Sequence, residues 1–461
     1  MQRRTFLQLL GAGSAALAAR PLWAASATAP TDQFFIFIHA SGGWDVTLWA
    51  DPRNERRGLV EPASTDNTEL AALTHWKGTK LDGDVETFTI LEAGGLRFGP
   101  GIGDLIDLHD RLTIVNGLAM NTVSHPDGTM FSCTGRHLAG GRSPAASIDV
   151  AITNELGTAQ LLPDIAIGFP ASYVGDHLDR RAIPLRIANA GVMAKSLARS
   201  DAYLKDADRA AITALLSDEA HDLATHSVFP ETFERLASQE AALPHLLGNE
   251  PGSAGLRTAF TPQALQAGYP QLDFKAKNLG GGALGAAFAV EAIKRNLIRT
   301  IGFALGGLDT HNQNYKQHAH TQQELFGTIA TLVGLLDATP HPTRQGHKLA
   351  DSTHILVFSD FCRTPQINLA GGRDHYPNNS ALVISPRFVA GKTFGKTDHE
   401  QVLPADAGLQ FSDGARPIAP PDLLATFLAA FAIDPRKYLR DGEVVKAMLR
   451  GLGLGSGSEV G

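Results

Sequence analysis

The chain has 461 residues, of which 43% are hydrophobic and 19% are charged, so it can bury a large core and is not an intrinsically disordered protein. Its formal net charge is -7 and its lysines and arginines are not clustered, which argues against a nucleic-acid partner. The two cysteines, Cys133 and Cys362, exclude a disulfide framework and leave open either one disulfide or two small buried thiols.

The first 29 residues have the pattern of an export signal. Two arginines at positions 3 and 4 precede a bulky apolar pair, an apolar run continues to Ala19, and small residues follow at 24–29. The run is shorter than the roughly 20 residues that a permanent membrane helix needs. We therefore expect residues 1–29 to be a twin-arginine signal peptide that the Tat export machinery recognises. The mature protein would be periplasmic or secreted, without a permanent membrane span.

The rest of the chain alternates between predicted strands and helices. Strands are expected at 34–39, 87–91, 112–116, 164–168, 300–305, 355–358 and 381–384. Helices are expected at 103–108, 148–156, 201–242, 284–298, 315–336 and 421–431. This alternation predicts an α/β fold with a mainly parallel sheet covered on both faces. We expect one domain over 30–450, with a helical flank near 201–270 and a flexible Gly/Ser-rich tail at 451–461.

Three of these strands lead into small residues and then into acidic or imidazole side chains. The strands at 34–39, 300–305 and 355–358 would place such groups at the carboxyl edge of the sheet, where α/β proteins bind ligands. Carboxylates and imidazoles together bind divalent transition metals. The residues predicted as metal ligands are Asp45, Asp309, His311, Asp360, Asp374 and His375.

Structural roles are the alternative for several of these residues. Asp45 or Asp360 could cap a helix or stabilise a turn instead of binding a metal. His318 and His320 are expected on a solvated helix face. The pair at 176–177 repeats the Asp-His pattern, but it lies in a polar loop where no ligand role is expected.

The ordered motifs also resemble those of a known family. They are Gly42-Gly-Trp-Asp45, Ser124-His125, Gly306-Gly-Leu-Asp-Thr-His311, Ser359-Asp-Phe-Cys-Arg-Thr-Pro365 and Gly372-Arg-Asp-His375. This set of motifs, following a twin-arginine signal, is similar to that of the bacterial family called domain of unknown function 1501. That family in turn resembles the alkaline phosphatase and sulfatase superfamily. The resemblance implies a three-layer α/β sandwich with a metal site at the carboxyl edge of its sheet.

The superfamily pattern implies how the ligands would be shared. Asp45 and Asp360 would belong to one metal, and Asp309, His311 and His375 to the other. Asp374 would be a ligand or a carboxylate that orients an imidazole. Phe361 stands where the superfamily usually has a histidine, so a single metal is the safer expectation.

The nucleophile is predicted less directly. Thr134-Gly-Arg136 resembles the triplet that follows the modified cysteine of sulfatases. Counting back from this triplet reaches His125, with Ser124 adjacent, so these two are the predicted catalytic residues. If catalysis is covalent, Ser124 is the candidate, activated by the metal. If it is not, His125 becomes a further ligand. Arg363 or Arg136 is a candidate for holding an anion, although most arginines are surface residues.

These observations predict a metal-dependent hydrolase-like protein that acts on a small anionic phosphate or sulfate ester, with zinc, manganese, iron or calcium as the divalent metal. One alternative is a catalytically degenerate, metal-stabilised binding or assembly protein of the cell envelope, which Phe361 favours. Another is a redox or metal-handling protein that uses Cys133 and Cys362.

Overall fold

The computed structural model describes residues 32–53, 73–76, 78–81, 85–157, 160, 162–188, 211, 214–215, 259–276 and 280–451. The predicted signal peptide, most of the predicted helical flank and the tail beyond residue 451 lie outside these ranges. Within them, no helix is both long and apolar enough to cross a membrane.

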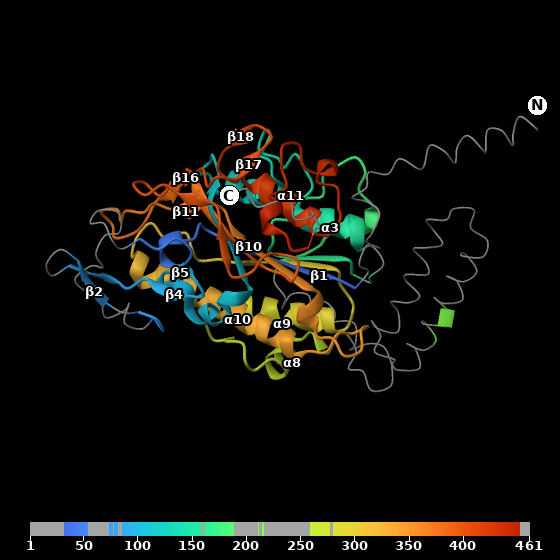
Figure 1. The fold of residues 1–461 in the computed structure, drawn as a ribbon. Helices are drawn as coiled ribbons and strands as arrows, with labels where there is room; N and C mark the ends of the chain where they lie inside the picture. The colour runs from blue at the N-terminus through green and yellow to red at the C-terminus, as the bar shows by residue number, and fades with distance from the viewer. Residues whose placement is uncertain are drawn as a thin grey trace, which may run out of the picture.

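An eight-stranded sheet organises the fold (Figure 1). In spatial order its strands are β14 (Lys392–Phe394), β6 (Leu112–Ala119), β13 (Asn378–Ile384), β10 (Thr353–Ser359), β1 (Phe34–Ala40), β9 (Thr300–Leu305), β7 (Asp164–Ile167) and β8 (Leu185–Ile187). Neighbours pair in parallel except at β13, which is antiparallel to both β10 and β6. The predicted mixed α/β fold with a mostly parallel sheet is confirmed.

The strand β1 shows why the sheet is buried on both faces. All seven of its residues are buried, and they are aromatic or aliphatic except for His39. Because side chains alternate along a strand, Ile36 and Ile38 join one hydrophobic core while Phe35 and Phe37 join the other.

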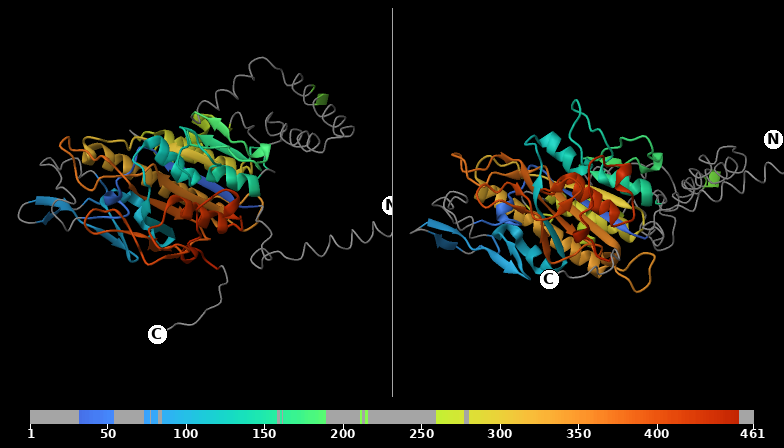
Figure 2. Two further views of the ribbon diagram at one scale, coloured as in Figure 1. Left: turned by 90° about the horizontal axis from the view of Figure 1, so that it is seen from above. Right: turned by 45° about the horizontal axis from the view of Figure 1, so that its top comes forward.

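Helices cover the two faces of the sheet (Figures 1 and 2). On the Ile36 side lie α9 (Gly280–Lys294) and α10 (Ala319–Ala338), and α8 (Pro262–Gly268) packs against α9. On the Phe35 side lie α3 (Ile148–Leu156) and α11 (Pro420–Ala429), with the end of α2 (His125–Thr134). The expected helices at 148–156, 284–298, 315–336 and 421–431 correspond to four of these.

Short elements fill the loops. The small hairpins are β2 (Gly78–Leu81) with β3 (Val85–Phe88), β4 (Leu91–Ala93) with β5 (Leu96–Phe98), β11 (Cys362–Arg363) with β12 (His375–Tyr376), β15 (Lys396–Thr397) with β16 (Pro404–Ala405), and β17 (Gln410–Phe411) with β18 (Gly414–Ala415). The short helices are η2 (Val46–Leu48), η4 (Pro100–Arg111), η5 (Arg180–Ala182), η6 (Asn314–His318), η7 (Leu349–Ser352), η8 (Pro435–Lys437) and η9 (Lys446–Met448).

Two predicted elements differ from the structure. The helix expected at 103–108 is part of the 3₁₀ helix η4, which Gly103 interrupts with a φ of 54° and a ψ of -150°. The strand expected at 87–91 is divided between β3 and β4, which belong to separate hairpins. Both predictions followed a local apolar pattern, which does not show where the backbone breaks, at Gly103 in one case and between β3 and β4 in the other.

Cys133 and Cys362 are both buried free thiols, so the structure corresponds to the alternative without a disulfide. Burial raises the pKa of each thiol well above its usual value. Since the thiolate is the reactive and metal-binding form, neither thiol is suited to redox or metal chemistry.

Candidate metal centre

The sheet brings three strand ends together. Ala40 at the end of β1 is in register with Leu305 of β9 on one side and with Ser359 of β10 on the other. The loops that follow these strands therefore start side by side. The helix α2 begins at the same edge, with Ser124 at its N-cap and Pro126 in its first turn. His125 is thereby placed at the start of the helix, facing the strand ends.

Four side chains meet at this edge, and we call them the His/Asp cluster: His125, Asp309, His311 and His375. The Nε2 atom of His375 lies 3.0 Å from that of His125 and 3.1 Å from that of His311. Asp309 Oδ1 lies 3.3 Å, 3.1 Å and 3.7 Å from the Nε2 atoms of His125, His311 and His375. The donor atoms of His125, Asp309 and His375 all lie within 4.8 Å of one another, as in a group that could hold a metal ion.

Each imidazole of the cluster is held through its other nitrogen. The Nδ1 contacts are His125 to Asp360 Oδ2 at 2.6 Å, His311 to Asp374 Oδ1 at 2.8 Å, and His375 to the Val123 carbonyl at 2.8 Å. Carboxylate and carbonyl oxygens only accept, so Nδ1 donates in all three and the Nε2 atom of a neutral ring presents a lone pair. Histidine ligands of metals are oriented in this way.

The Nε2 lone pairs that face one another repel unless a proton or a cation lies between them. One proton can lie between two imidazoles, but His375 Nε2 faces two of them and a carboxylate oxygen as well. A cation coordinated by all of these atoms removes the repulsion between their lone pairs. The residues present therefore fit a divalent metal.

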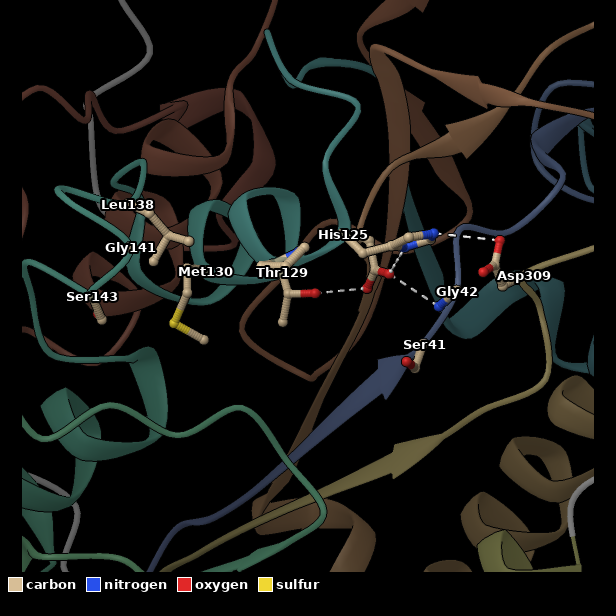
Figure 3. Close-up of a pocket in the computed structure, with 11 residues that line it drawn as sticks. Ser41, Gly42, His125, Thr129, Met130, Leu138, Gly141, Ser143 and Asp309 are labelled. Atoms are coloured by element: carbon tan, nitrogen blue, oxygen red, sulfur yellow. Dashed lines mark hydrogen bonds and ion pairs between the residues drawn. The ribbon is translucent and has the colours of Figure 1, made fainter.

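Asp360 fixes the orientation of the His125 ring through its contact with Nδ1. Its carboxylate contacts the Gly42 amide at 3.1 Å and the Thr129 hydroxyl at 3.0 Å, besides His125 (Figure 3). It also contacts His39 Nε2 at 2.5 Å. Burial alone would raise the pKa of Asp360, but the two histidines and their hydrogen bonds hold it well below its usual range. Both oxygens are thus occupied by donors, and the structure gives Asp360 an orienting position where the sequence analysis expected a ligand.

Asp45 lies outside the cluster. Its side chain is fully buried, with Oδ2 2.9 Å from Arg373 Nε and 2.9 Å from Asn314 Nδ2, while Oδ1 accepts from Thr47. Burial raises the pKa of Asp45, but the Arg373 charge together with the other partners of the carboxylate, including the Thr47 and Asn314 hydrogen bonds, lowers it below its usual value. The expected ligand is thus the N-cap of η2 and the partner of a buried arginine, because Arg373 reaches it from the loop that carries His375.

The expectation that His318 is solvated is wrong. Its ring is buried, with Nδ1 2.7 Å from the Thr310 hydroxyl and Nε2 accepting from the Asp45 amide at 2.9 Å. Burial lowers the pKa of His318 to about 4, so the ring is neutral. This histidine fixes the start of α10 to the loop after β1.

Arg363 is a buried neighbour of the cluster. Its guanidinium is fully inaccessible and donates to Asp309 Oδ1 at 2.6 Å, to the Gly43 carbonyl at 3.0 Å and to the Arg373 carbonyl at 3.2 Å. Burial raises the pKa of Asp309, and the hydrogen bond and charge of Arg363 lower it again. Arg363 is committed to these contacts, and Arg136, the other expected anion clamp, contacts the Pro144 carbonyl at 3.5 Å.

A cavity of about 460 Å³ opens beside the cluster (Figure 3). Its lining is Ser41, Gly42, His125, Pro126, Thr129, Met130, Leu138, Gly141, Ser143, Asp309 and Asp360. Ser124, the predicted nucleophile, is exposed at the N-cap of α2, makes no capping hydrogen bond with its side chain, and is not part of this lining.

Two residues of the site were not singled out from the sequence. His39 was read only as the end of an apolar strand, although a polar residue in such a strand is itself a signal of a buried contact. Thr129 lies one turn after His125 on α2 and gave no signal of its own. Phe361 is fully buried, and its ring centroid is 4.7 Å from those of both His125 and His375.

The chain belongs to the family described as Protein of unknown function (DUF1501), whose model matches residues 33–445. No relative was found among curated proteins. Among solved structures, the chain is similar to Ps i-CgsB in complex with k-i-k-neocarrahexaose, with a TM-score of 0.35 and 12% identity, covering 89% of this chain and 75% of that one. A protein from work on glycosaminoglycan metabolism by Bacteroides thetaiotaomicron gives a TM-score of 0.32 and 9% identity, covering 88% and 74%. Neither likeness is strong enough to support a functional argument.

Proposed function

We propose that this protein is an exported, metal-dependent hydrolase-like protein that acts on a phosphate or sulfate ester. The observation that carries the proposal is the convergence of three imidazole Nε2 atoms and Asp309 Oδ1, each imidazole being held at Nδ1 by an acceptor. Export and a periplasmic location rest on the twin-arginine pattern at the start of the chain.

His125, Asp309, His311 and His375 would hold the metal. Imidazole donors favour zinc or iron, and the added carboxylate is compatible with manganese, whereas calcium takes oxygen ligands. A divalent cation at such a site neutralises charge on the oxygens of a phosphate or sulfate group and on the departing oxygen. Asp360 and Asp374 orient two of the imidazoles, and Arg363 balances the charge of Asp309.

The fold that we propose is the three-layer sandwich of the alkaline phosphatase and sulfatase superfamily. Helices on both faces of the sheet and a site at the carboxyl ends of β1, β9 and β10 are compatible with it. One cluster of three or more donors was found in the described part of the chain, which favours one metal over two.

The nucleophile is either the Ser124 hydroxyl or water. Ser124 directly precedes His125, which lines the cavity. A covalent route requires that the Ser124 side chain turn towards the cavity. Loss of turnover in Ser124→Ala, with metal content unchanged, would support a covalent route; full activity in that variant would leave water as the nucleophile.

The first experiment is elemental analysis of the purified mature protein, with Asp309→Ala and His375→Ala beside the wild type. We expect about one equivalent of zinc, manganese or iron in the wild type and loss of that metal in both variants. Asp176→Ala and His177→Ala are matched controls, because this exposed Asp-His pair repeats the pattern of Asp374 and His375. Turnover of aryl phosphates and sulfates should then disappear with a chelator and return with the metal.

A second candidate function is that of a metal-stabilised binding or assembly protein of the cell envelope. Phe361 favours it, because its ring packs against His125 and His375 at the position where the superfamily usually has a ligand. Bound metal without turnover of any ester would support this candidate. Folded wild-type protein without metal, indistinguishable from the two variants, would exclude the metallohydrolase.

A further inference from the structure

The cavity beside the His/Asp cluster has two unlike ends. His125 and Asp309 form one end, where an anionic group would meet the metal. Met130 and Leu138, from α2 and the segment after it, lie at the other (Figure 3), and Pro126 also lines the cavity. A volume of about 460 Å³ is within the range of small-molecule sites. The ligand is therefore expected to have a charged head and an apolar body.

The charges around the cavity limit the number of anionic groups. Among the residues of the described part of the chain that line it, there is no lysine or arginine. Arg363, the buried arginine beside Asp309, is fully inaccessible and donates to Asp309 and to backbone carbonyls. Asp309 is half-exposed and would repel any anion that is not neutralised by the metal. A second sulfate, phosphate or carboxylate on the ligand would thus have no cationic partner in this cavity.

Resting on the proposed function, we infer that the substrate is an ester whose single anionic group binds at the metal and whose leaving group is uncharged and apolar, such as an aryl or alkyl ring. The apolar body packs against Met130, Leu138 and Pro126. Burying it there contributes affinity in proportion to the apolar area removed from water.

The test compares kcat/KM of the metal-loaded protein for 4-nitrophenyl phosphate and sulfate, for a monosaccharide phosphate and sulfate, and for a disaccharide with several sulfates. We expect the aryl esters to be preferred. Leu138→Lys should raise KM for the aryl ester by about tenfold, with a smaller change in kcat, because it removes an apolar contact from the leaving group. The same change should improve use of the polysulfated disaccharide, because it adds a cation at the apolar end.

Leu185→Lys is the matched control, since Leu185 is 42% exposed on the edge strand β8 and does not line the cavity. It should change neither KM nor the order of preference. Metal content is measured for each variant so that loss of metal is not mistaken for a change in specificity. Preference for the polysulfated or monosaccharide ester by the wild type, with metal bound, would overturn the inference and leave the proposed function standing. Absence of turnover for every ester by the metal-loaded protein would overturn both.

Discussion

Asp360 is the residue on which the geometry of His125 depends. Its carboxylate is almost inaccessible and receives His39, Thr129 and the Gly42 amide together with His125 Nδ1. Replacement of a carboxylate that orients a metal-bound histidine typically weakens metal binding by about 10–100-fold. We predict a loss of this size for Asp360→Asn, measured by competition with a chelating indicator. Unchanged affinity would mean that His125 is positioned without Asp360.

Asp374 provides a comparison within the same site. It makes the equivalent contact to His311 Nδ1 at 2.8 Å, but its side chain is 54% exposed. Water can replace it as an acceptor, so Asp374→Asn should weaken metal binding by less than Asp360→Asn does. The reverse order of the two variants, in the same titration, would show that burial does not decide the strength of these contacts.

At the scale of the elements, the loops after β1 and β9 approach so closely that only glycine fits at residue 42. Gly42 has a φ of 110°, and a Cβ there would lie 2.4 Å from the Asp309 amide nitrogen. We predict that Gly42→Ala costs roughly 1–3 kcal/mol of unfolding free energy and reduces metal binding, because the Asp309 loop must move. Gly306→Ala is the control, since a Cβ there meets nothing within 4 Å. Equal denaturant midpoints for the two variants would contradict the prediction.

A buried pair of carboxyl groups joins α3 to β7. Burial raises the pKa of Asp149 to about 6, and burial together with the neighbouring Asp149 raises the pKa of Asp164 well above its usual value. The folded state therefore binds more protons than the unfolded state, whose carboxyls titrate near 4. The pair costs no stability below pH 4, and the cost grows as the pH rises through 6.

Asp149→Asn should remove much of this cost. We predict that the variant gains on the order of 1–3 kcal/mol over the wild type at pH 8, and that the gain shrinks as the pH falls towards 4. Urea unfolding of both proteins across this pH range measures the difference. A difference that stays constant with pH would show that the pair does not titrate in the folded protein.

At the scale of the whole molecule, the His/Asp cluster ties together distant parts of the chain. Its members come from α2, from the loop after β9 and from β12. A metal that binds the folded state alone stabilises it by about 2.7 kcal/mol at a concentration 100 times its Kd. We predict a rise of this size in unfolding free energy for the wild type and none for His375→Ala. Equal stabilisation of the two proteins by the metal would place its binding site elsewhere.

The fold was largely predictable because its strands are continuous apolar runs, such as Ile355 to Phe358, that alternate with helical patterns. The antiparallel direction of β13 was not predictable, since a strand's own sequence carries no mark of its direction. Asp309 and His311 were found by their position after a predicted strand, and Asp374 and His375 by the glycines that precede them in a loop. Their grouping with His125, rather than with Asp45, depends on Arg373 and Phe361, whose contacts the sequence does not show.

The same reasoning explains why the sequence did not show the contacts of Asp45 and Asp360. A carboxylate after a strand reads alike whether it binds a metal, caps a turn as Asp45 does, or holds an imidazole as Asp360 does. The difference is made by partners several hundred residues away, and these become neighbours only when the sheet has formed. His39 was overlooked for the same reason, because its partner Asp360 directly follows a different strand, β10.

The place of β1 in the sheet has a consequence for biosynthesis. This strand is the first of the eight sheet strands in the chain, yet it lies between β9 and β10, so one of its edges stays unpaired until residue 305 has been translated and the other until residue 359. An unpaired apolar strand is prone to aggregate. The nascent chain is thus expected to depend on chaperones through most of its translation, and a product truncated before β10 should be insoluble.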